Sequence, residues 1–186
     1  NSNFCRIVFV GRLVYAKGVD DLLSAIALLT PDFPALSVSV IGDGPHRAVL
    51  EARACKLDIA HIVVFYGSLN LSSIRDILWQ ADIFVNPSHS EGFPRSVLEA
   101  AAVGLPVVAT DVGGTREIIE SDISGILIPI HDSYVLTERL RYLLSDGSAR
   151  CRMGDAAQDR VRMFFSNTKM VETYARIYET CAVSRE

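Results

Sequence analysis

The sequence predicts an α/β fold: a doubly wound, Rossmann-like parallel sheet of about six strands in a three-layer α/β/α arrangement, with extra C-terminal helices. Short, almost wholly apolar, β-branched runs alternate with segments whose apolar residues recur at helical spacing. Such runs are typical of parallel strands that are buried on both faces. Strand and helix alternating six times, with right-handed crossovers, gives a doubly wound sheet.

The elements can be placed in order along the chain. The strands are expected at Arg6–Val10, Ser37–Ile41, Ile62–Tyr66, Ile83–Asn86, Val107–Ala109 and Gly125–Ile128. The first helix repeats apolar residues at helical spacing from Val19 to Leu29. The helix after the fourth strand has Pro94 in its first turn and Gly104 just past its end, the usual start and stop signals. Three helices follow the last strand, at about Ser133–Leu144, Ser148–Phe164 and Thr168–Cys181.

The last predicted helix carries more apolar surface than a free chain end requires. Val171, Tyr174, Ile177 and Tyr178 fall on one stripe of this helix. We expect the stripe to pack on the same domain. The alternative is that it forms a surface for a partner.

The composition describes one domain with a substantial core. Of the 186 residues, 49% are apolar and the mean hydropathy is +0.27, which argues against disorder. The 18 Lys and Arg residues face 22 Asp and Glu, so we expect no nucleic-acid partner. The longest apolar runs are strand-length, far below the roughly 20 residues of a membrane span. Because the chain lacks an initial Met and enters a strand almost at once, we expect residues 1–186 to be a single domain of a longer protein.

Metal and disulfide chemistry are not indicated by the sequence. Cys5, Cys55, Cys151 and Cys181 form no C-x-x-C pair, so we expect no zinc site, no disulfide framework and a reducing, cytoplasmic location. The four histidines show no metal-ligand spacing either. His89 lies near the predicted site, but we interpret it as incidental. We therefore expect no metal and no cofactor.

The loops best placed for a ligand follow the first and fourth strands. In a doubly wound sheet the ligand lies beyond the carboxyl ends of the strands where strand order reverses, commonly between those two strands. The first of these loops reads GRLVYAKG, in which Gly11 ends the strand tightly and Arg12 and Lys17 supply two cations. A guanidinium and an ammonium suit a diphosphate, and a solvated pair of surface charges is the alternative.

The loop after the fourth strand, SEGFPRSVLE, supplies two carboxylates and a helix start. Gly92 permits close backbone approach, and the amides of Arg95–Val97 are expected to be unpaired donors reinforced by the helix dipole. Glu91 and Glu99 would border one cavity without forming a close pair; the alternative for Glu99 is a solvent-facing position. An anion at a helix start, with hydroxyl-binding carboxylates on both sides, fits a sugar-diphosphate-ribose.

Two more glycine pairs follow the second and fifth strands. IGDGPHR has Gly42 and Gly44 at the first two positions of the dinucleotide fingerprint, but Arg47 stands at the third, which disfavours a dehydrogenase. This loop either approaches phosphates through its glycines or forms only a tight turn. TDVGGTREII adds Gly113 and Gly114, which again allow close backbone approach.

Four blocks between about Val8 and Ile130 resemble a known family. They are GRLVYAKGVDDLL, VIGDGP, ADIFVNPSHSEGFPRSVLEAAAVGLPVVATDVGGTREII and GILIP. They resemble the nucleotide-sugar-binding half of family 4 retaining glycosyltransferases (glycosyl transferases group 1), which have the two-domain GT-B fold. The E-x7-E spacing of Glu91 and Glu99 is the most specific part. The resemblance implies a C-terminal, donor-binding domain, a nucleoside-diphosphate sugar as its donor, and an N-terminal acceptor domain that is absent from this chain.

The resemblance also implies how the donor is held and activated. Arg12 and Lys17 would hold the diphosphate, helped by the amides near Ser96 and Val97. Because negative charge grows on the diphosphate as the glycosidic bond breaks, these groups would act in catalysis without a metal ion. Losing one such donor typically costs on the order of 3 kcal/mol of barrier.

Other donor contacts follow from the same resemblance. Glu91 would contact the transferred sugar as a third catalytic residue, and Glu99 would bind the ribose hydroxyls. The remaining donor-binding positions are Gly11, Gly42, Gly44, Gly92, Phe93, Pro94 and Arg95, with the base stacking near Tyr66 and Gly67.

The activity that the resemblance implies is retaining transfer of a hexose, of glucose or mannose type, to an acceptor. The isolated domain is expected to be inactive without its acceptor domain. Alternatives are a GT-B epimerase or phosphorylase that uses the same cleft, and a non-catalytic nucleotide-binding module. Any membrane contact is expected only through the missing half, as a peripheral association at the inner face of the membrane.

Overall fold

The computed structural model describes residues 4–183, apart from the side chains of residues 167, 177 and 179–183. Six parallel strands form one sheet in the order β3-β2-β1-β4-β5-β6. They are β1 (Cys5–Val10), β2 (Leu36–Ile41), β3 (Val63–Gly67), β4 (Ile83–Asn86), β5 (Val107–Thr110) and β6 (Ile126–Ile128). This order is that of a Rossmann sheet, which confirms the predicted doubly wound fold.

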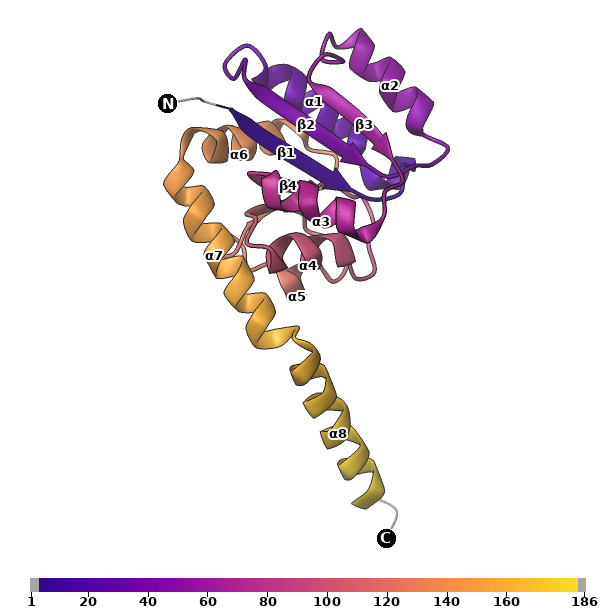
Figure 1. The fold of residues 1–186 in the computed structure, drawn as a ribbon, viewed down its shortest axis with the longest axis vertical. Coiled ribbons are helices and arrows are strands. Elements are labelled where there is room, and N and C mark those ends of the chain that lie inside the picture. The colour runs from indigo at the N-terminus through magenta and orange to yellow at the C-terminus, as the bar shows by residue number, and fades with distance from the viewer. Residues whose placement is uncertain (1–3, 184–186) are drawn as a thin grey trace.

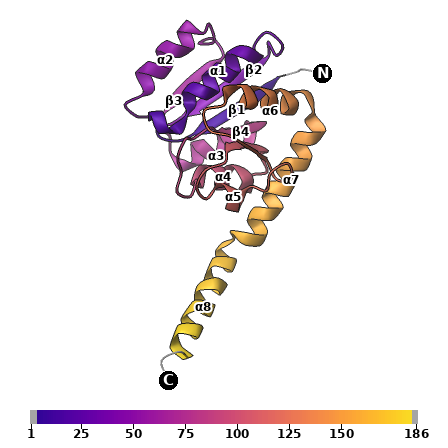
Figure 2. The same cartoon turned by 180° about the vertical axis from the view of Figure 1, so that it is seen from behind.

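Helices cover both faces of the sheet. They are η1 (Tyr15–Lys17), α1 (Val19–Leu29), α2 (Arg47–Lys56), α3 (Leu71–Gln80), α4 (Arg95–Ala102), α5 (Thr115–Ile118), α6 (Ser133–Ser145), α7 (Gly147–Phe164) and α8 (Asn167–Val183). Figure 1 shows α3 and α4 in front of the sheet, and the reverse view in Figure 2 shows α1, α2 and α6 on the other side. The predicted three layers are therefore present.

Each face of the sheet has its own core. Ile7 and Phe9 of β1 pack on one face with α1, α2 and α6. Val8, between them, packs on the other face with α3, α4 and the second half of α7. Successive strand residues point to opposite faces, and all three of these side chains are fully buried. Burial on both faces explains why the strand sequences are almost wholly apolar.

Aspartates begin the first two helices that follow the sheet. The Asp132 carboxylate accepts a hydrogen bond from the Val135 amide at the start of α6, at 2.9 Å. Asp146 accepts one from the Ala149 amide at the start of α7, also at 2.9 Å. These caps satisfy amides that have no partner within the helix. Within the described residues, none of the helices is long and apolar enough to cross a bilayer.

Among the described residues, the apolar side chains of the final helix, α8, do not pack on this domain. This helix follows α7 and projects away from the sheet in both views (Figures 1 and 2). Val171, Tyr174 and Tyr178 are 62%, 56% and 71% exposed, and the side chain of Ile177 lies outside the described residues. The expectation that this stripe packs on the same domain is wrong. Because α7 already runs past α4 and α5, α8 begins where no face of the sheet remains to be covered.

Candidate functional site

Loops from different strands converge at the carboxyl edge of the sheet, where strand order reverses between β1 and β4. The His89 amide in the loop after β4 donates to the carbonyl of Ala16 in the loop after β1, at 2.8 Å. The Gly114 amide in the loop after β5 donates to the carbonyl of Gly92, at 2.7 Å. The loop after β4 is therefore held between its two neighbours. This is the edge at which the sequence places a ligand.

The loop after β2 also packs against these loops. Gly42 has a φ of 130°, and a Cβ there would lie 1.9 Å from the Gly11 carbonyl oxygen. A Cβ on Gly44 would lie 2.3 Å from the carbonyl oxygen of Leu13. Only glycine permits so close an approach. Both glycines are thus required by the packing of this loop against the loop after β1.

Gly92 differs from the other loop glycines because, among the described residues other than its two chain neighbours, no atom lies within 4 Å of where its Cβ would be. By contrast, Gly113 has a φ of 51°, and its Cβ would lie 2.0 Å from the Glu91 carbonyl oxygen. The packing of this chain therefore explains the glycine at position 113. At position 92 it leaves open space, which a ligand can approach closely.

Lys17 and Glu91 form a direct ion pair. The distance from Lys17 Nζ to Glu91 Oε1 is 2.6 Å, and the two side chains are 25% and 9% exposed. This contact could not be predicted from local sequence patterns, because the two residues lie 74 positions apart. The pair joins the loop after β1 to the loop after β4 through two of the predicted catalytic residues.

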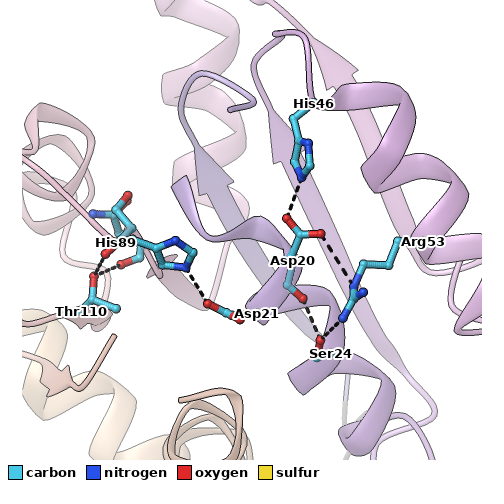
Figure 3. A network of polar contacts seen from close by, with 9 residues as sticks. Asp20, Asp21, Ser24, His46, Arg53, His89 and Thr110 are labelled. Atoms are coloured by element: carbon cyan, nitrogen blue, oxygen red, sulfur yellow. Dashed lines mark hydrogen bonds and ion pairs between the residues drawn. The ribbon is translucent and has the colours of Figure 1, made fainter. Parts of the chain in front are cut away.

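A chain of buried polar groups holds the Glu91 carboxylate in place. The Asn86 side-chain amide donates to Glu91 Oε1 at 3.4 Å, and the Ser88 hydroxyl donates to Asn86 Oδ1 at 3.1 Å. The Thr110 hydroxyl at the end of β5 in turn donates to the Ser88 carbonyl, in the group around His89 in Figure 3. Asn86, Ser88 and Thr110 are all buried. Buried polar groups that satisfy one another fix the loop that carries Glu91.

The first turn of α4 presents two free amides rather than the three expected. The Val97 amide donates to the Pro94 carbonyl at 3.0 Å, so it is used inside the helix. The expectation that it is an unpaired donor is wrong, because the first turn of the helix closes on Pro94. Within the described residues, the amides of Arg95 and Ser96 have no acceptor, and no side chain caps the helix. The helix start thus keeps the features of an anion site.

Arg12 and Glu99 open onto two neighbouring hollows. Arg12 lines a cleft of about 390 Å³ together with Gly42, Leu69 and Ile74. Glu99 lines the hollow between α3 and α4, and Ile74 lines this hollow as well. Among the described residues the Arg12 guanidinium has no hydrogen-bond or ion-pair partner. A ligand held by both residues would pass over Ile74.

The charged side chains on α4 are only loosely paired. Arg95 is 85% exposed, and its guanidinium lies 3.9 Å from the Glu99 carboxylate, which is 41% exposed. An ion pair this exposed contributes at most about 1 kcal/mol and breaks easily. Glu99 therefore stays available for hydroxyl groups.

Two predicted contact residues lie away from the Arg12 cleft. Tyr66 lines a groove on the face of the sheet beside Ser39 and Gln80, and Ser68 and Leu69 are the residues after β3 that reach the cleft. Side-chain alternation along β3 turns Tyr66 outward, where it is 44% exposed.

The second of these residues, Phe93, packs toward the end of α7. The centroid of its ring lies 5.9 Å from that of Phe165, and the side chain is 42% exposed. The sugar contact was expected from the backbone of Phe93, and this backbone lies in the loop that carries Glu91.

The loop after β5 is held at its rim by an ion pair. The Arg116 guanidinium donates to both carboxylate oxygens of Asp111. These hydrogen bonds lower the pKa of the Asp111 carboxyl. Asp111 is thus a fixed negative charge next to the glycine pair of this loop.

Two histidine–aspartate pairs flank the first turn of α1 (Figure 3). His46 Nε2 lies 2.8 Å from Asp20 Oδ2, and Arg53 approaches the same aspartate at 3.9 Å. On the other side, His89 Nε2 lies 2.8 Å from Asp21 Oδ2. His89, interpreted from the sequence as incidental, thus ties the loop after β4 to α1. Local sequence patterns could not predict this contact, because Asp21 lies 68 positions away from His89.

Comparison with known proteins identifies the family. The family model described as "Glycosyl transferases group 1" matches residues 1–160. The chain belongs to this glycosyltransferase family. It is 31% identical over 173 residues to a glycogen synthase from Mycobacterium tuberculosis, covering 93% of this chain and 42% of that protein. The chain thus spans about two fifths of the length of this relative.

Solved glycosyltransferase structures share the fold. The C-terminal domain of a glycosyl transferase group 1 family protein (LpcC) from Francisella tularensis matches with a TM-score of 0.82 and 27% identity, over 88% of this chain and 87% of that one. Anabaena HepE, solved with UDP and glucose, matches with a TM-score of 0.88 and 23% identity, over 96% of this chain and 49% of that one.

Proposed function

We propose that this chain is the C-terminal, donor-binding domain of a retaining GT-B glycosyltransferase, and that it binds a nucleoside-diphosphate hexose of glucose or mannose type. The observation that carries the proposal is the free guanidinium of Arg12 in a cleft lined by the loops after β1, β2 and β3, next to a hollow lined by Glu99. A free cation and a carboxylate in two neighbouring hollows suit a diphosphate and a ribose.

The charge distribution supports donor activation by the chain's own groups. As the bond between the sugar and the diphosphate breaks, negative charge grows on the diphosphate, and Arg12 together with the free amides at the α4 start can stabilise it. Lys17 adds a positive charge beside Glu91. We therefore propose that donor cleavage needs no metal ion. Glu91, fixed by Lys17 and Asn86, is proposed to contact the transferred sugar.

The partner that completes the enzyme is proposed to be an N-terminal acceptor domain of the same parent protein. The match to a relative of which this chain covers 42% supports a larger parent. The exposed apolar residues of α8, Val171, Tyr174 and Tyr178, support a packing partner outside this domain. Transfer to an acceptor would then require both halves. A cytoplasmic location is proposed on the basis of the widely spaced cysteines, of which Cys5, Cys55 and Cys151 are free among the described residues.

The proposal is tested by thermal unfolding of the 186-residue chain with a panel of nucleotides. The panel contains UDP, GDP and ADP, their glucose and mannose conjugates, and NAD, each with and without EDTA. UDP and UDP-glucose come first because the Anabaena neighbour was solved with UDP and glucose. A ligand at a hundredfold excess over its Kd stabilises the fold by about 2.7 kcal/mol. For a domain of this size that raises the Tm by roughly 5–10 °C.

We expect one nucleoside-diphosphate series to raise the Tm, equally with and without EDTA, and NAD to have no effect. Stabilisation by NAD alone would favour a dinucleotide-binding function. Stabilisation that EDTA abolishes would contradict metal-independent donor binding. No shift with any nucleoside diphosphate would contradict the proposal that this domain binds the donor.

A further inference from the structure

Three potential metal ligands from distant segments meet beside the site. Asp21 lies in the first turn of α1, His89 in the loop after β4, and His131 in the loop after β6. One ligand atom from each lies within 4.8 Å of the other two. The centroids of the two imidazole rings are 3.8 Å apart. Only the fold brings these residues together, since the sequence places them dozens of positions apart.

His89 has the ring chemistry that metal binding needs. Its side chain is 10% exposed, and its Nε2 is held by the Asp21 carboxylate at 2.8 Å. Its other ring nitrogen, Nδ1, points the opposite way and has no hydrogen-bond partner among the described residues. An ion held jointly by His89 and Asp21 would therefore bind Nε2 and take the place of the hydrogen bond between the two side chains.

The set of ligand atoms favours one class of metal. Two imidazole nitrogens and one carboxylate oxygen suit zinc and similar divalent transition metals, whereas calcium and magnesium prefer oxygen ligands alone. Three protein ligands leave a fourth position for water or an outside group. The neighbouring Asp20–His46 pair lacks a second imidazole, and Arg53 approaches its carboxylate instead (Figure 3).

We propose that Asp21, His89 and His131 bind one zinc-like divalent transition-metal ion. The bound ion would join α1 to the loops after β4 and β6. His89 lies two residues before Glu91, and its amide bonds the loop that carries Lys17, so the ion would hold the Lys17–Glu91 region in place. This site is separate from donor cleavage and stands independently of the proposed function.

The test is titration of the tag-free chain with Zn²⁺ by calorimetry and with Co²⁺ by visible absorption spectroscopy. Cys55, Cys151 and Cys181 are first replaced by serine so that thiols do not supply ligands. His131→Asn removes one ligand. Because His131 has a φ of 56°, which asparagine tolerates well, this variant should keep the fold. His46→Asn is the matched control, since it removes a histidine from an aspartate pair outside the cluster.

We expect one equivalent of metal per chain, a Co²⁺ spectrum typical of tetrahedral coordination, and a rise in Tm on adding Zn²⁺. Affinity should fall by about tenfold or more in His131→Asn, and in the isosteric variant Asp21→Asn, but not in His46→Asn. Absence of one-equivalent binding would overturn the proposal. Binding that His131→Asn leaves unchanged, or that His46→Asn weakens equally, would overturn it as well.

Discussion

Replacing Lys17 by methionine tests whether the Lys17–Glu91 ion pair organises the site. Methionine keeps a long apolar side chain but removes the positive charge next to a carboxylate that is 9% exposed. Breaking a buried pair costs about 3–5 kcal/mol, whereas an exposed pair contributes about 0.2–1 kcal/mol. The Lys17 side chain is 25% exposed, so the pair lies between these limits. We expect Lys17→Met to lower the free energy of unfolding by about 2 kcal/mol.

A double-mutant cycle with Glu91→Gln separates the pair from other effects. Glutamine keeps the shape of the side chain and leaves Lys17 free to reach water, so this variant should lose only about 1 kcal/mol. The double variant should be less unstable than the sum, with a coupling energy of about 1 kcal/mol in urea unfolding at low and high salt. Coupling should persist in 1 M salt because the carboxylate is shielded from solvent. Costs that simply add, or coupling that salt abolishes, would show that the pair is an ordinary surface contact.

Three further predictions concern the glycines, the buried thiol and the last helix. Gly92→Ala should leave the free energy of unfolding unchanged but weaken donor binding measured by calorimetry. Gly113→Ala, whose Cβ would lie 2.0 Å from a carbonyl oxygen, should unfold at a lower urea concentration. The reverse pattern would contradict the open space at Gly92. Burial raises the pKa of the Cys5 thiol from 9.0 to about 12, so its thiolate is disfavoured in the fold. The free energy of unfolding should therefore fall as pH rises above about 9, by at most about 1.4 kcal/mol per unit, and Cys5→Ala should show a shallower slope; identical slopes would contradict this. Removing residues 167–186 should change the free energy of unfolding by less than about 0.5 kcal/mol, because the described apolar side chains of α8 are exposed; a larger loss would place α8 in the core.

The sheet could be predicted from the sequence because its strands are buried on both faces. Burial of this kind leaves a continuous apolar run, as in IVFV of β1 or IFV of β4, and this signal does not depend on distant residues. Strand bounds were correct to within one residue. The position of α8 could not be predicted in the same way. An apolar stripe predicts that this side of a helix will be buried, but it does not predict which domain or molecule buries it.

The site could be predicted only in part, for a related reason. The switch-point rule predicted that Arg12 and the α4 start lie at the carboxyl edge of the sheet, as they do in the structure, because this follows from strand order alone. The Lys17–Glu91 pair and the Asp21–His89 contact depend on how two loops meet across β1 and β4. The spacing of residues along the chain does not predict contacts of this kind between two loops. The Val97 amide, which was expected to be free, instead donates to the Pro94 carbonyl in the first turn of α4.

The most direct test of the central claim is calorimetric titration of Arg12→Ala with the nucleoside diphosphate that stabilises the parent chain. The control is Arg139→Ala, which removes an exposed arginine from α6, a helix in the core on the opposite face of the sheet from Ile74 of the cleft. Loss of a charge-assisted contact of about 1.5–3 kcal/mol predicts a roughly 10- to 150-fold weaker Kd for Arg12→Ala. The control should bind like the parent. Equal affinity of Arg12→Ala and the parent would contradict a diphosphate site in the Arg12 cleft.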